Sequence, residues 1–295
     1  MSVLSTIAIG INPNIFAFGP FLLSWHGFLT FVAVATAVYL TYRWGTKEGM
    51  DPDAILSVAV WGIIAGIVGA RVFHVADFWG PIYSHNPISV FYVWQGGIAI
   101  YGAIIGGFIG CVTYMTIRNS DWFLNLWRKR LGFLGEAQKA PLPGIGHLAD
   151  LTAPALLIAM AIGRIGDIIN GEHCALATRL PWGVVYSQDN FAAQACGGFA
   201  SHPAVVYELL FDLALLLVIW PMRHRLRPQG MTFALYGALY STGRFFISFL
   251  RVESNNYWIF NEAQIVALAV VIITIPLLVY KAQLVRVVRP SRQRS

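Results

Sequence analysis

Four polar side chains follow an apolar run in the second half of the chain. Arg164, Asp167, Asn170 and Glu172 come soon after the apolar run 151–162, "LTAPALLIAMAI". An arginine inside a membrane span costs about 2.5–3.5 kcal/mol on insertion scales, so it usually faces a cavity or a charged partner. Its guanidinium is a planar set of N–H donors that fits carboxylate or phosphate oxygens. The stretch therefore predicts either a buried ion pair or a site for an anionic ligand.

Further ionisable or polar side chains lie within other apolar runs or at their ends. They are Arg71, His74 and Asp77 in one run, Glu208 and Asp212 in another, and Tyr240, Arg244, Ser248 and Arg251 in a third. The last four share one helical face. Any single group can be explained by an arginine–carboxylate pair that only joins helices. Such pairs give no more stability than apolar packing, so this structural explanation is weaker for the whole set. Several groups together favour a polar site.

The composition indicates which elements must position these groups. Apolar residues make up 57% of the 295 residues and charged residues only 12%, whereas soluble domains have about 45–50% and 25%. This balance predicts an integral membrane protein. The net charge of +6 falls in short basic blocks between apolar runs, without a nucleic-acid-binding motif. We therefore expect no nucleic-acid partner.

Seven apolar segments are long enough to cross a bilayer, which takes about 20 residues. They are 19–42, 54–75, 97–117, 149–169, 203–222, 231–250 and 261–280. Fifteen of the 20 lysines and arginines lie after the first, third, fifth and last segments. By the positive-inside rule, this predicts an all-α membrane protein with its N-terminus outside and its C-terminus in the cytoplasm. We expect one polytopic domain over 1–295, an outer head segment at 171–202 and a basic cytoplasmic tail at 281–295.

This topology places the polar groups in the outer half of the membrane. The abundant anion there is the phosphate of a phospholipid. Trp25–His26–Gly27 and the aromatic residues of 91–102 are typical of the headgroup level, where they can also be simple interfacial anchors. The sequence therefore predicts a lipid-facing site that binds phosphate.

Glycines and cysteines have mostly structural explanations. Gly102, Gly106 and Gly110, like Gly62 and Gly66, are four residues apart, a spacing that lets membrane helices pack closely. Cys111 is expected to be a packing residue. Cys174 and Cys196 share one loop and are candidates for a disulfide if that loop faces an oxidising compartment.

The stretch 163–183, "GRIGDIINGEHCALATRLPWG", resembles the signature of the prolipoprotein diacylglyceryl transferase family. That signature is Gly-Arg-x-Gly-Asn-x-x-Asn-x-Glu, followed after a short gap by Pro-Trp-Gly. Further segments are similar to other family motifs: "WHGFL" (25–29), "VWQGGIAIYGAIIGG" (93–107), "HPAVVYELL" (202–210) and "YSTGRFFISFLR" (240–251). Because these motifs occur in order along most of the chain, the resemblance is specific.

The resemblance implies a reaction and a location. A diacylglyceryl group passes from phosphatidylglycerol to the thiol of the lipobox cysteine in a prolipoprotein signal peptide. A thioether forms and glycerol phosphate leaves. The family works in the bacterial plasma (inner) membrane as a multi-pass protein, and we expect no metal and no bound organic cofactor.

The resemblance also assigns residues. Arg164 and Arg244 match two arginines on which the family relies, and would hold the phosphate as its charge grows in the transition state. Glu172 and Glu208 match family carboxylates that orient those arginines or hold the headgroup. The other candidate substrate-binding residues are Asp167, Asn170, Tyr240 and Arg251.

Three positions depart from the family. Tyr101 stands where well-known members have a histidine proposed as the general base, and tyrosine, with an ordinary pKa of about 10, is a poor base at neutral pH. Asp167 replaces an asparagine, and Ser248 stands where some members have a glutamate. His26 occupies a position where tyrosine is common, and is a candidate substitute base or an interfacial side chain. Tyr101 and His26 are both candidate catalytic residues, and the identity of the base stays open.

Two other functions stay open beside transfer. A diverged homologue could bind phospholipid without catalysis, as the three departures suggest. An anion transporter would also use intramembrane arginines. The polar groups near one membrane face and the lack of a visible internal repeat argue against transport.

Overall fold

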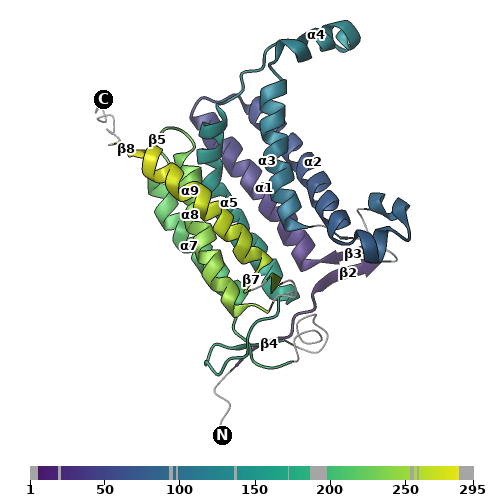
Figure 1. Cartoon of the computed structure of the whole chain (residues 1–295), viewed down its shortest axis with the longest axis vertical. Helices are drawn as coiled ribbons and strands as arrows, with labels where there is room; N and C mark the ends of the chain where they lie inside the picture. Colours follow the sequence, from purple (N-terminus) through teal and green to yellow (C-terminus); the bar gives the residue numbers. More distant parts are fainter. Residues whose placement is uncertain are drawn as a thin grey trace. The chain divides into compact units, whose positions relative to one another are not determined.

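The computed structural model describes residues 6–18, 21–92, 96–97, 99–135, 138–171, 173–186, 198–252, 256–257 and 259–285. Most of these residues are helical, with short two-stranded ladders between the helices (Figure 1). They group into two compact units, one made of Met1–Thr41 and Gly146–Ser295 and the other of Tyr42–Ile145. The expectation of a single polytopic domain over 1–295 stays a prediction.

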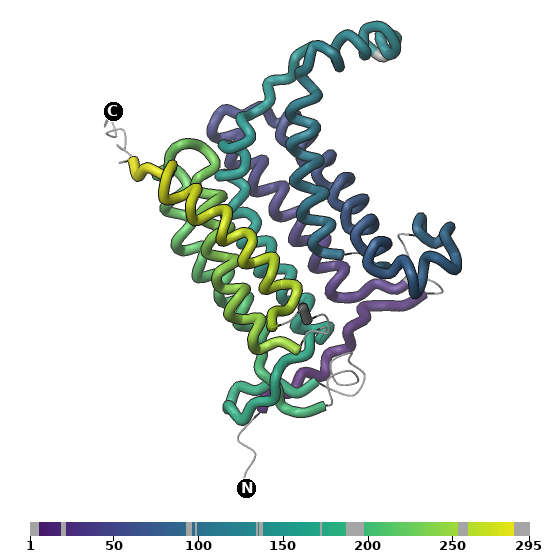
Figure 2. Tube along the Cα trace, viewed as in Figure 1, coloured from purple at the N-terminus to yellow at the C-terminus, as the bar shows by residue number. Residues whose placement is uncertain are grey.

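The first unit is a helical bundle. Its helices are α1 (Trp25–Lys47, which runs into the second unit at its end), α5 (Ile145–Asn170), α7 (Ala204–Met222), α8 (Met231–Ile247) and α9 (Glu262–Lys281). The core contains Ala153 and Leu157 of α5 with Leu215 and Ile219 of α7, and partly buried side chains of α8 pack against it. Helices α5, α7, α8 and α9 therefore lie side by side (Figure 2).

Local capping explains where two of these helices begin. Asn261 and Gln264 form a reciprocal capping box at the start of α9. Helix α8 begins after Gly230, whose φ of 99° favours glycine. The carboxylate of Asp150 on α5 accepts the backbone N–H groups of Gly230 at 2.7 Å and Phe233 at 2.9 Å. This buried side chain thus ties α8 to α5.

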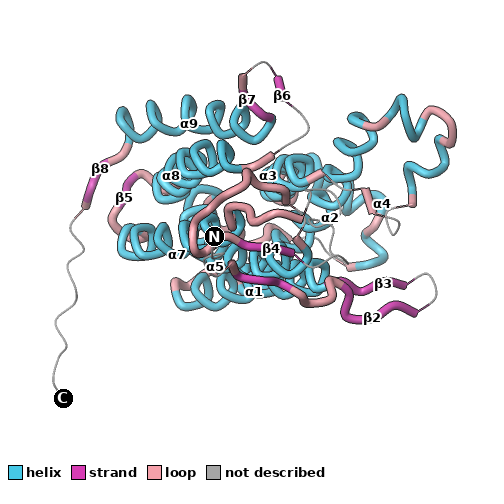
Figure 3. Tube along the Cα trace, turned by 90° about the horizontal axis from the view of Figure 1, so that it is seen from below, coloured by secondary structure: helices cyan, strands magenta, loops and turns pink. Residues whose placement is uncertain are grey.

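Short strands tie the loops of the first unit together. They pair as β1 (Ile7–Ile9) with β4 (Val184–Tyr186) in parallel, and antiparallel as β2 (Asn14–Phe18) with β3 (Phe21–Ser24), β5 (Leu226–Arg227) with β8 (Gln283–Leu284), and β6 (Asn256–Tyr257) with β7 (Phe260–Asn261) (Figure 3). Isolated bridges join Ala175 to Arg251 and Ala177 to Ser201. The head segment (171–202) is therefore held at several points where it is described.

The second unit is built on two closely packed helices, α2 (Pro52–Asp77) and α3 (Ile100–Ile117). Asp51 caps α2 by accepting the N–H of Ala54 at 2.7 Å. A Cβ atom added at Gly106 of α3 would stand 3.0 Å from the Cα of Gly69 on α2. The prediction that glycines at four-residue spacing serve helix packing is confirmed.

Shorter helices complete the second unit. After α2 come the π-helix η1 (Trp79–Tyr83) and the 3-10 helix η2 (Pro87–Phe91), and after α3 come α4 (Asp121–Arg130) and the 3-10 helix η4 (Gly132–Leu134). Ser120 caps α4, and three basic residues form its last turn. This helix was not predicted, because ten residues of mixed polarity do not form an apolar run.

In the part of the chain that the structure describes, six helices are long and apolar enough to cross a membrane: α1, α2, α3, α5, α7 and α9. Each begins and ends within a few residues of the corresponding predicted segment, except that α1 begins at Trp25 rather than residue 19. Residues 21–24 instead form β3, which pairs with β2. The seventh predicted segment corresponds to α8, 17 residues long, continued by the 3-10 helix η5 (Ser248–Leu250).

Candidate active site

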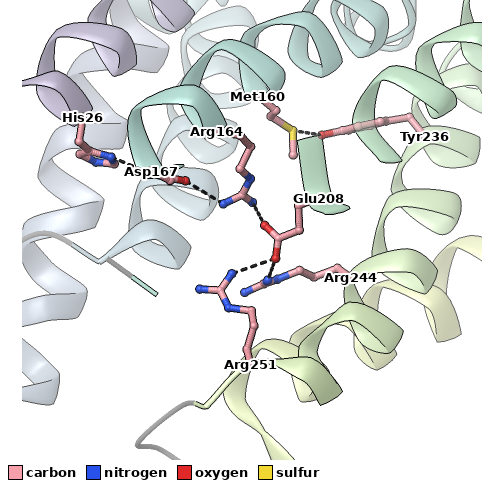
Figure 4. Close-up of polar contacts among 8 residues, drawn as sticks. All are labelled: His26, Met160, Arg164, Asp167, Glu208, Tyr236, Arg244 and Arg251. Carbon is pink, nitrogen blue, oxygen red and sulfur yellow. Dashed lines mark hydrogen bonds and ion pairs between the residues drawn. The ribbon is translucent and has the colours of Figure 1, made fainter. Parts of the chain in front are cut away.

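Charged side chains from four helices and one loop meet in the first unit. Figure 4 shows His26 of α1, Arg164 and Asp167 of α5, Glu208 of α7, Arg244 of α8 and Arg251, which follows η5. We call these six residues the arginine cluster. Their pairing is continuous from His26 at one end to Arg251 at the other.

Glu208 is the centre of the arginine cluster. Its Oε2 lies 2.7 Å from Nη2 of Arg164, and its Oε1 accepts from Nη1 of Arg251 at 2.9 Å and from Nη1 of Arg244. The Glu208 side chain is only 3% exposed. One buried carboxylate therefore orients three guanidinium groups toward the same point.

Asp167 joins the cluster to α1. Its Oδ1 lies 2.7 Å from Nδ1 of His26, and its Oδ2 accepts from Nη1 of Arg164 at 3.0 Å. Gly166, just before it, lets α1 come close, since an added Cβ would stand 3.0 Å from the Cα of His26. Asp167 thus has a histidine partner at one oxygen and an arginine partner at the other.

Two residues of the head segment, His173 and Tyr186, interact electrostatically with residues of the cluster. Neither was predicted as a site residue. Burial, and then the charge of Arg251, lower the pKa of His173 to about 4, so this histidine is neutral at physiological pH. Burial, and then the negative charge of Asp167, raise the pKa of Tyr186 to about 12, so its hydroxyl keeps its proton. No sequence pattern marked either residue, because the turn of the head segment and strand β4 bring them into place.

Two buried side chains beside the cluster have polar atoms without a hydrogen-bond partner among the described residues. Asp212, one turn after Glu208, is fully buried with neither carboxylate oxygen bonded, and interacts electrostatically with Arg164, Glu208 and Arg244. Ser248 is 1% exposed, and its hydroxyl is also unbonded. Polar atoms without a partner are costly to bury, so their presence indicates that this part of the bundle has a functional role.

The remaining predicted site residues are placed as follows. Tyr240 stacks on Tyr236 at 5.9 Å between ring centroids and interacts electrostatically with Arg164. Asn170 is the last residue of α5. Glu172 lies outside the described residues. Tyr101 is at the start of α3, in the second unit, so its catalytic role stays a prediction.

Arg71 has a different environment from the one that the sequence suggested. It was grouped with arginines suited to an anion, but its guanidinium donates to backbone carbonyl groups, among them Val90 at 2.8 Å, Gly96 at 2.7 Å and Gly97 at 2.9 Å. These contacts all lie within the second unit. Arg71 therefore fastens the loop before α3, a structural role.

Two of the segments that resemble family motifs are joined by a hydrogen bond between the head segment and α7. The indole Nε1 of Trp182, in Pro-Trp-Gly, donates to the hydroxyl of Tyr207 at 2.8 Å. Tyr207 directly precedes Glu208, so this contact supports the start of α7 beside the arginine cluster.

The two described cysteines differ in their state. Cys174 is disulfide-bonded and Cys111 is free. Cys196 lies outside the described residues. Among the described residues, no group of three histidine, cysteine or acidic side chains is placed to hold a metal ion.

The chain matches known proteins over most of its length. The family model described as prolipoprotein diacylglyceryl transferase matches residues 13–128 and 139–280. A phosphatidylglycerol–prolipoprotein diacylglyceryl transferase of Thermosynechococcus vestitus is 31% identical over 251 residues, covering 84% of this chain and 85% of that protein. Proteins of the same name are 31% identical in Synechococcus elongatus, covering 99% of this chain and 97% of that protein, and 29% identical in Staphylococcus aureus, covering 92% and 89%. The chain therefore belongs to the prolipoprotein diacylglyceryl transferase family.

Proposed function

We propose that this protein transfers the diacylglyceryl group of phosphatidylglycerol to the lipobox cysteine thiol of prolipoproteins. The transfer forms a thioether and releases glycerol phosphate. Family membership supports the reaction, and the arginine cluster is the observation that carries its assignment to a site. Within the arginine cluster, three guanidinium groups are paired with two carboxylates, Asp167 and Glu208, which leaves one positive charge when His26 is neutral. Such a site favours the single negative charge of a phosphodiester.

The chemistry requires one bond to form and one to break. The sulfur attacks the glycerol carbon that bears the phosphate, so a C–S bond forms, and the C–O bond breaks with its electron pair on the phosphate. Charge grows on the phosphate oxygens as this happens. Guanidinium groups that are already oriented stabilise that charge with little reorganisation, and such stabilisation supplies much of the rate enhancement in many enzymes.

Each member of the cluster then has a role. Arg164 and Arg244, whose side chains are each 16% exposed, hold the phosphate, and Arg251 supports them through the shared Glu208. Glu208 keeps the three guanidinium groups oriented. Asn170, Glu172 and Tyr240 complete the polar pocket for the headgroup. The positive charges also raise the reactive fraction of the incoming thiol, which is only a few per cent thiolate at neutral pH when its pKa is about 8.5.

The proposal includes a position in the membrane. Helix α8 with η5 provides the seventh span, the N-terminus lies outside, and the basic tail 281–295 lies in the cytoplasm. The head segment and the arginine cluster then belong to the outer half of a bacterial inner membrane. Phosphatidylglycerol and the signal peptides of secreted prolipoproteins are both accessible from that side.

A complementation experiment tests the proposed function. The protein is expressed in bacteria depleted of their own transferase, and thioether-linked prolipoprotein is measured with inserted protein quantified in the same membranes. We expect lipid modification to be restored. Good insertion without product contradicts the proposal. In that case, retained phosphatidylglycerol binding indicates a binding homologue, whereas flux of a phosphorylated solute in proteoliposomes indicates a transporter.

A further inference from the structure

The transfer reaction needs a group that accepts the thiol proton, and the arginine cluster contains a histidine paired with a carboxylate. We propose that His26 accepts this proton, with Asp167 as the positioning residue that orients the imidazole and stabilises its protonated form. This inference rests on the proposed function. It assigns the proton acceptor to the first unit and gives a purpose to the aspartate that replaces the family's asparagine.

The short contact fixes which nitrogen of His26 is basic. Nδ1 of His26 lies 2.7 Å from Oδ1 of Asp167 (Figure 4). Because a carboxylate can only accept, Nδ1 carries the hydrogen, and the lone pair of the neutral ring is then on Nε2. An orienting carboxylate of this kind holds the correct tautomer and stabilises the imidazolium that forms.

Asp167 is suited to two donors, which an asparagine is not. One of its oxygens accepts from His26 and the other from Arg164. A side-chain amide at this position could accept with its oxygen from only one of them, and its NH2 group would face the other donor. The presence of histidine at position 26 and aspartate at position 167 is therefore a matched pair within this chain.

The position of His26 relative to the phosphate-binding arginine fits an in-line displacement. The sulfur must approach the carbon from the side opposite the departing phosphate oxygen. The proton acceptor and the phosphate-binding arginine must therefore lie near the same carbon, but on opposite sides of it. His26 and Arg164 contact opposite oxygens of the same carboxylate. Thus one short side chain sets the separation between the proposed base and the clamp.

Exposure also favours His26. Its side chain is 40% exposed, compared with 16% for Arg164 and 3% for Glu208. Because its side chain is the more exposed, His26 is more accessible to a substrate thiol than Arg164 or Glu208. Among the described residues, the other charged or titratable groups that interact with the pair are Arg164 from α5, and His173 and Tyr186 from the head segment.

The other groups near the pair are poor proton acceptors. His173 has a pKa of about 4 because of burial and the charge of Arg251, so it binds a thiol proton weakly at neutral pH. Tyr186 keeps its proton, since burial and the charge of Asp167 raise its pKa to about 12. Neither can replace His26 near pH 7.

The proposed step is balanced. The S–H bond breaks and its proton moves to Nε2 of His26, while its electron pair forms the C–S bond. The C–O bond breaks, and its electron pair leaves with the phosphate held by Arg164 and Arg244. The imidazolium then gives its proton to the departing glycerol phosphate or to water, which restores the neutral ring.

The test uses the full-length protein in phosphatidylglycerol-containing proteoliposomes, with a cysteine peptide copied from a prolipoprotein signal sequence. The rate of thioether formation is measured from pH 5 to pH 9 for the wild type, His26→Ala, His26→Gln and Asp167→Asn. His224→Gln, a change at an exposed histidine next to Arg223, is the matched control. Thermal unfolding of each variant shows whether the protein is folded.

We expect both His26 variants to lose about 100-fold or more in kcat/KM and to lose the acidic limb of the pH profile. Added imidazole should partly restore His26→Ala. Asp167→Asn should lose about tenfold or more, with its acidic limb at lower pH because the imidazolium is no longer stabilised by a carboxylate. His224→Gln should match the wild type.

Different failures have different meanings. An inactive wild type overturns the proposed function itself. An active wild type, with a folded His26→Gln variant that keeps the wild-type rate and pH profile, overturns only the assignment of His26. Loss of activity in His26→Gln together with loss of phosphatidylglycerol binding also overturns it, since the side chain would then serve substrate binding and not proton transfer.

Discussion

Two buried arginine sites, one in each unit, differ in the kind of partner that holds the guanidinium. Arg71 in the second unit is 7% exposed and donates to backbone carbonyl groups of residues 89–97. Arg164, Arg244 and Arg251 in the first unit instead surround the carboxylate of Glu208. In each site the guanidinium groups have oxygen acceptors, as buried polar groups require.

The difference decides which site can bind a substrate. The carbonyl groups of the loop cannot leave Arg71 unless the loop unfolds. The N–H donors of Arg71 that bind these carbonyl groups are therefore not offered to a ligand. The carboxylate of Glu208 is a charged partner shared by three arginines, and a phosphate offers the same kind of charged oxygens. An arginine in a membrane span is thus a sign of function only when its partners can be shared with a ligand.

The largest effect is expected from arginines of the cluster. Arg164→Ala and Arg244→Ala should each lower kcat/KM by at least about 100- to 1000-fold, because each removes donors that act on the developing phosphate charge. The kcat/KM values of Arg164→Lys and Arg244→Lys should lie between those of the wild type and the alanine variants, since lysine keeps the charge but not the planar set of N–H donors. The measurement is thioether formation in proteoliposomes.

Arg179→Ala is the matched control for these variants. Arg179 is an exposed arginine of the head segment that lies outside the cluster, and its removal should leave kcat/KM within about twofold of the wild type. Full activity in either cluster variant would remove the phosphate clamp from the mechanism.

The second prediction concerns the arginine held by carbonyl groups. Arg71→Met keeps much of the side-chain volume but leaves several buried carbonyl groups without their donor. Each such loss costs about 1–3 kcal/mol, so we expect a total destabilisation of at least about 3 kcal/mol. Thermal unfolding and proteolysis between residues 89 and 97 should report it, whereas KM for phosphatidylglycerol in the folded fraction should not change. A raised KM with unchanged stability would show that Arg71 binds substrate after all.

The elements were predictable from the sequence to a large extent. Long apolar runs bounded by charges predicted the helices closely, because bilayer thickness sets their length. The first segment began too early, since residues 21–23 are apolar yet belong to strand β3, which pairs with β2. The two-stranded ladders and α4 were missed because their segments are too short or too polar to stand out from loops.

The site was predicted only in part. Motif spacing identified Arg164, Glu208, Arg244 and Arg251, and the structure brings these four together. The pairing of His26 with Asp167 joins residues 141 positions apart, so no local pattern could indicate it. His173 and Tyr186 were missed for a similar reason, since the fold of the head segment gives them their burial.

The third prediction is a pH effect on stability from His173, whose protonated form is disfavoured by burial and then by the charge of Arg251. Its pKa is about 4 in the folded protein and about 6.5 when unfolded. Above pH 6.5 the residue is neutral in both states and costs nothing. As the pH falls from 6.5 to 4, only the unfolded state takes up the proton, so stability decreases by at most about 3 kcal/mol.

His173→Gln should remove this dependence. Thermal unfolding midpoints measured between pH 4 and pH 7.5 should fall less steeply with decreasing pH in the variant than in the wild type. His85→Gln, at an exposed histidine of the second unit, is the control and should keep the wild-type slope. Equal slopes in all three proteins would mean that folding does not lower the pKa of His173.

The smallest effect is expected at Tyr101, in the same unit as Arg71. If His26 accepts the thiol proton, the phenol of Tyr101 contributes at most a hydrogen bond, and Tyr101→Phe should lower kcat/KM by no more than about threefold. Thioether formation across pH 5–9 is again the measurement, and the acidic limb should stay in place. A loss near 100-fold, or a shifted limb, would transfer the role of base from His26 to Tyr101. Such a result would also mean that the second unit has a catalytic role in addition to the structural role of Arg71 and its loop.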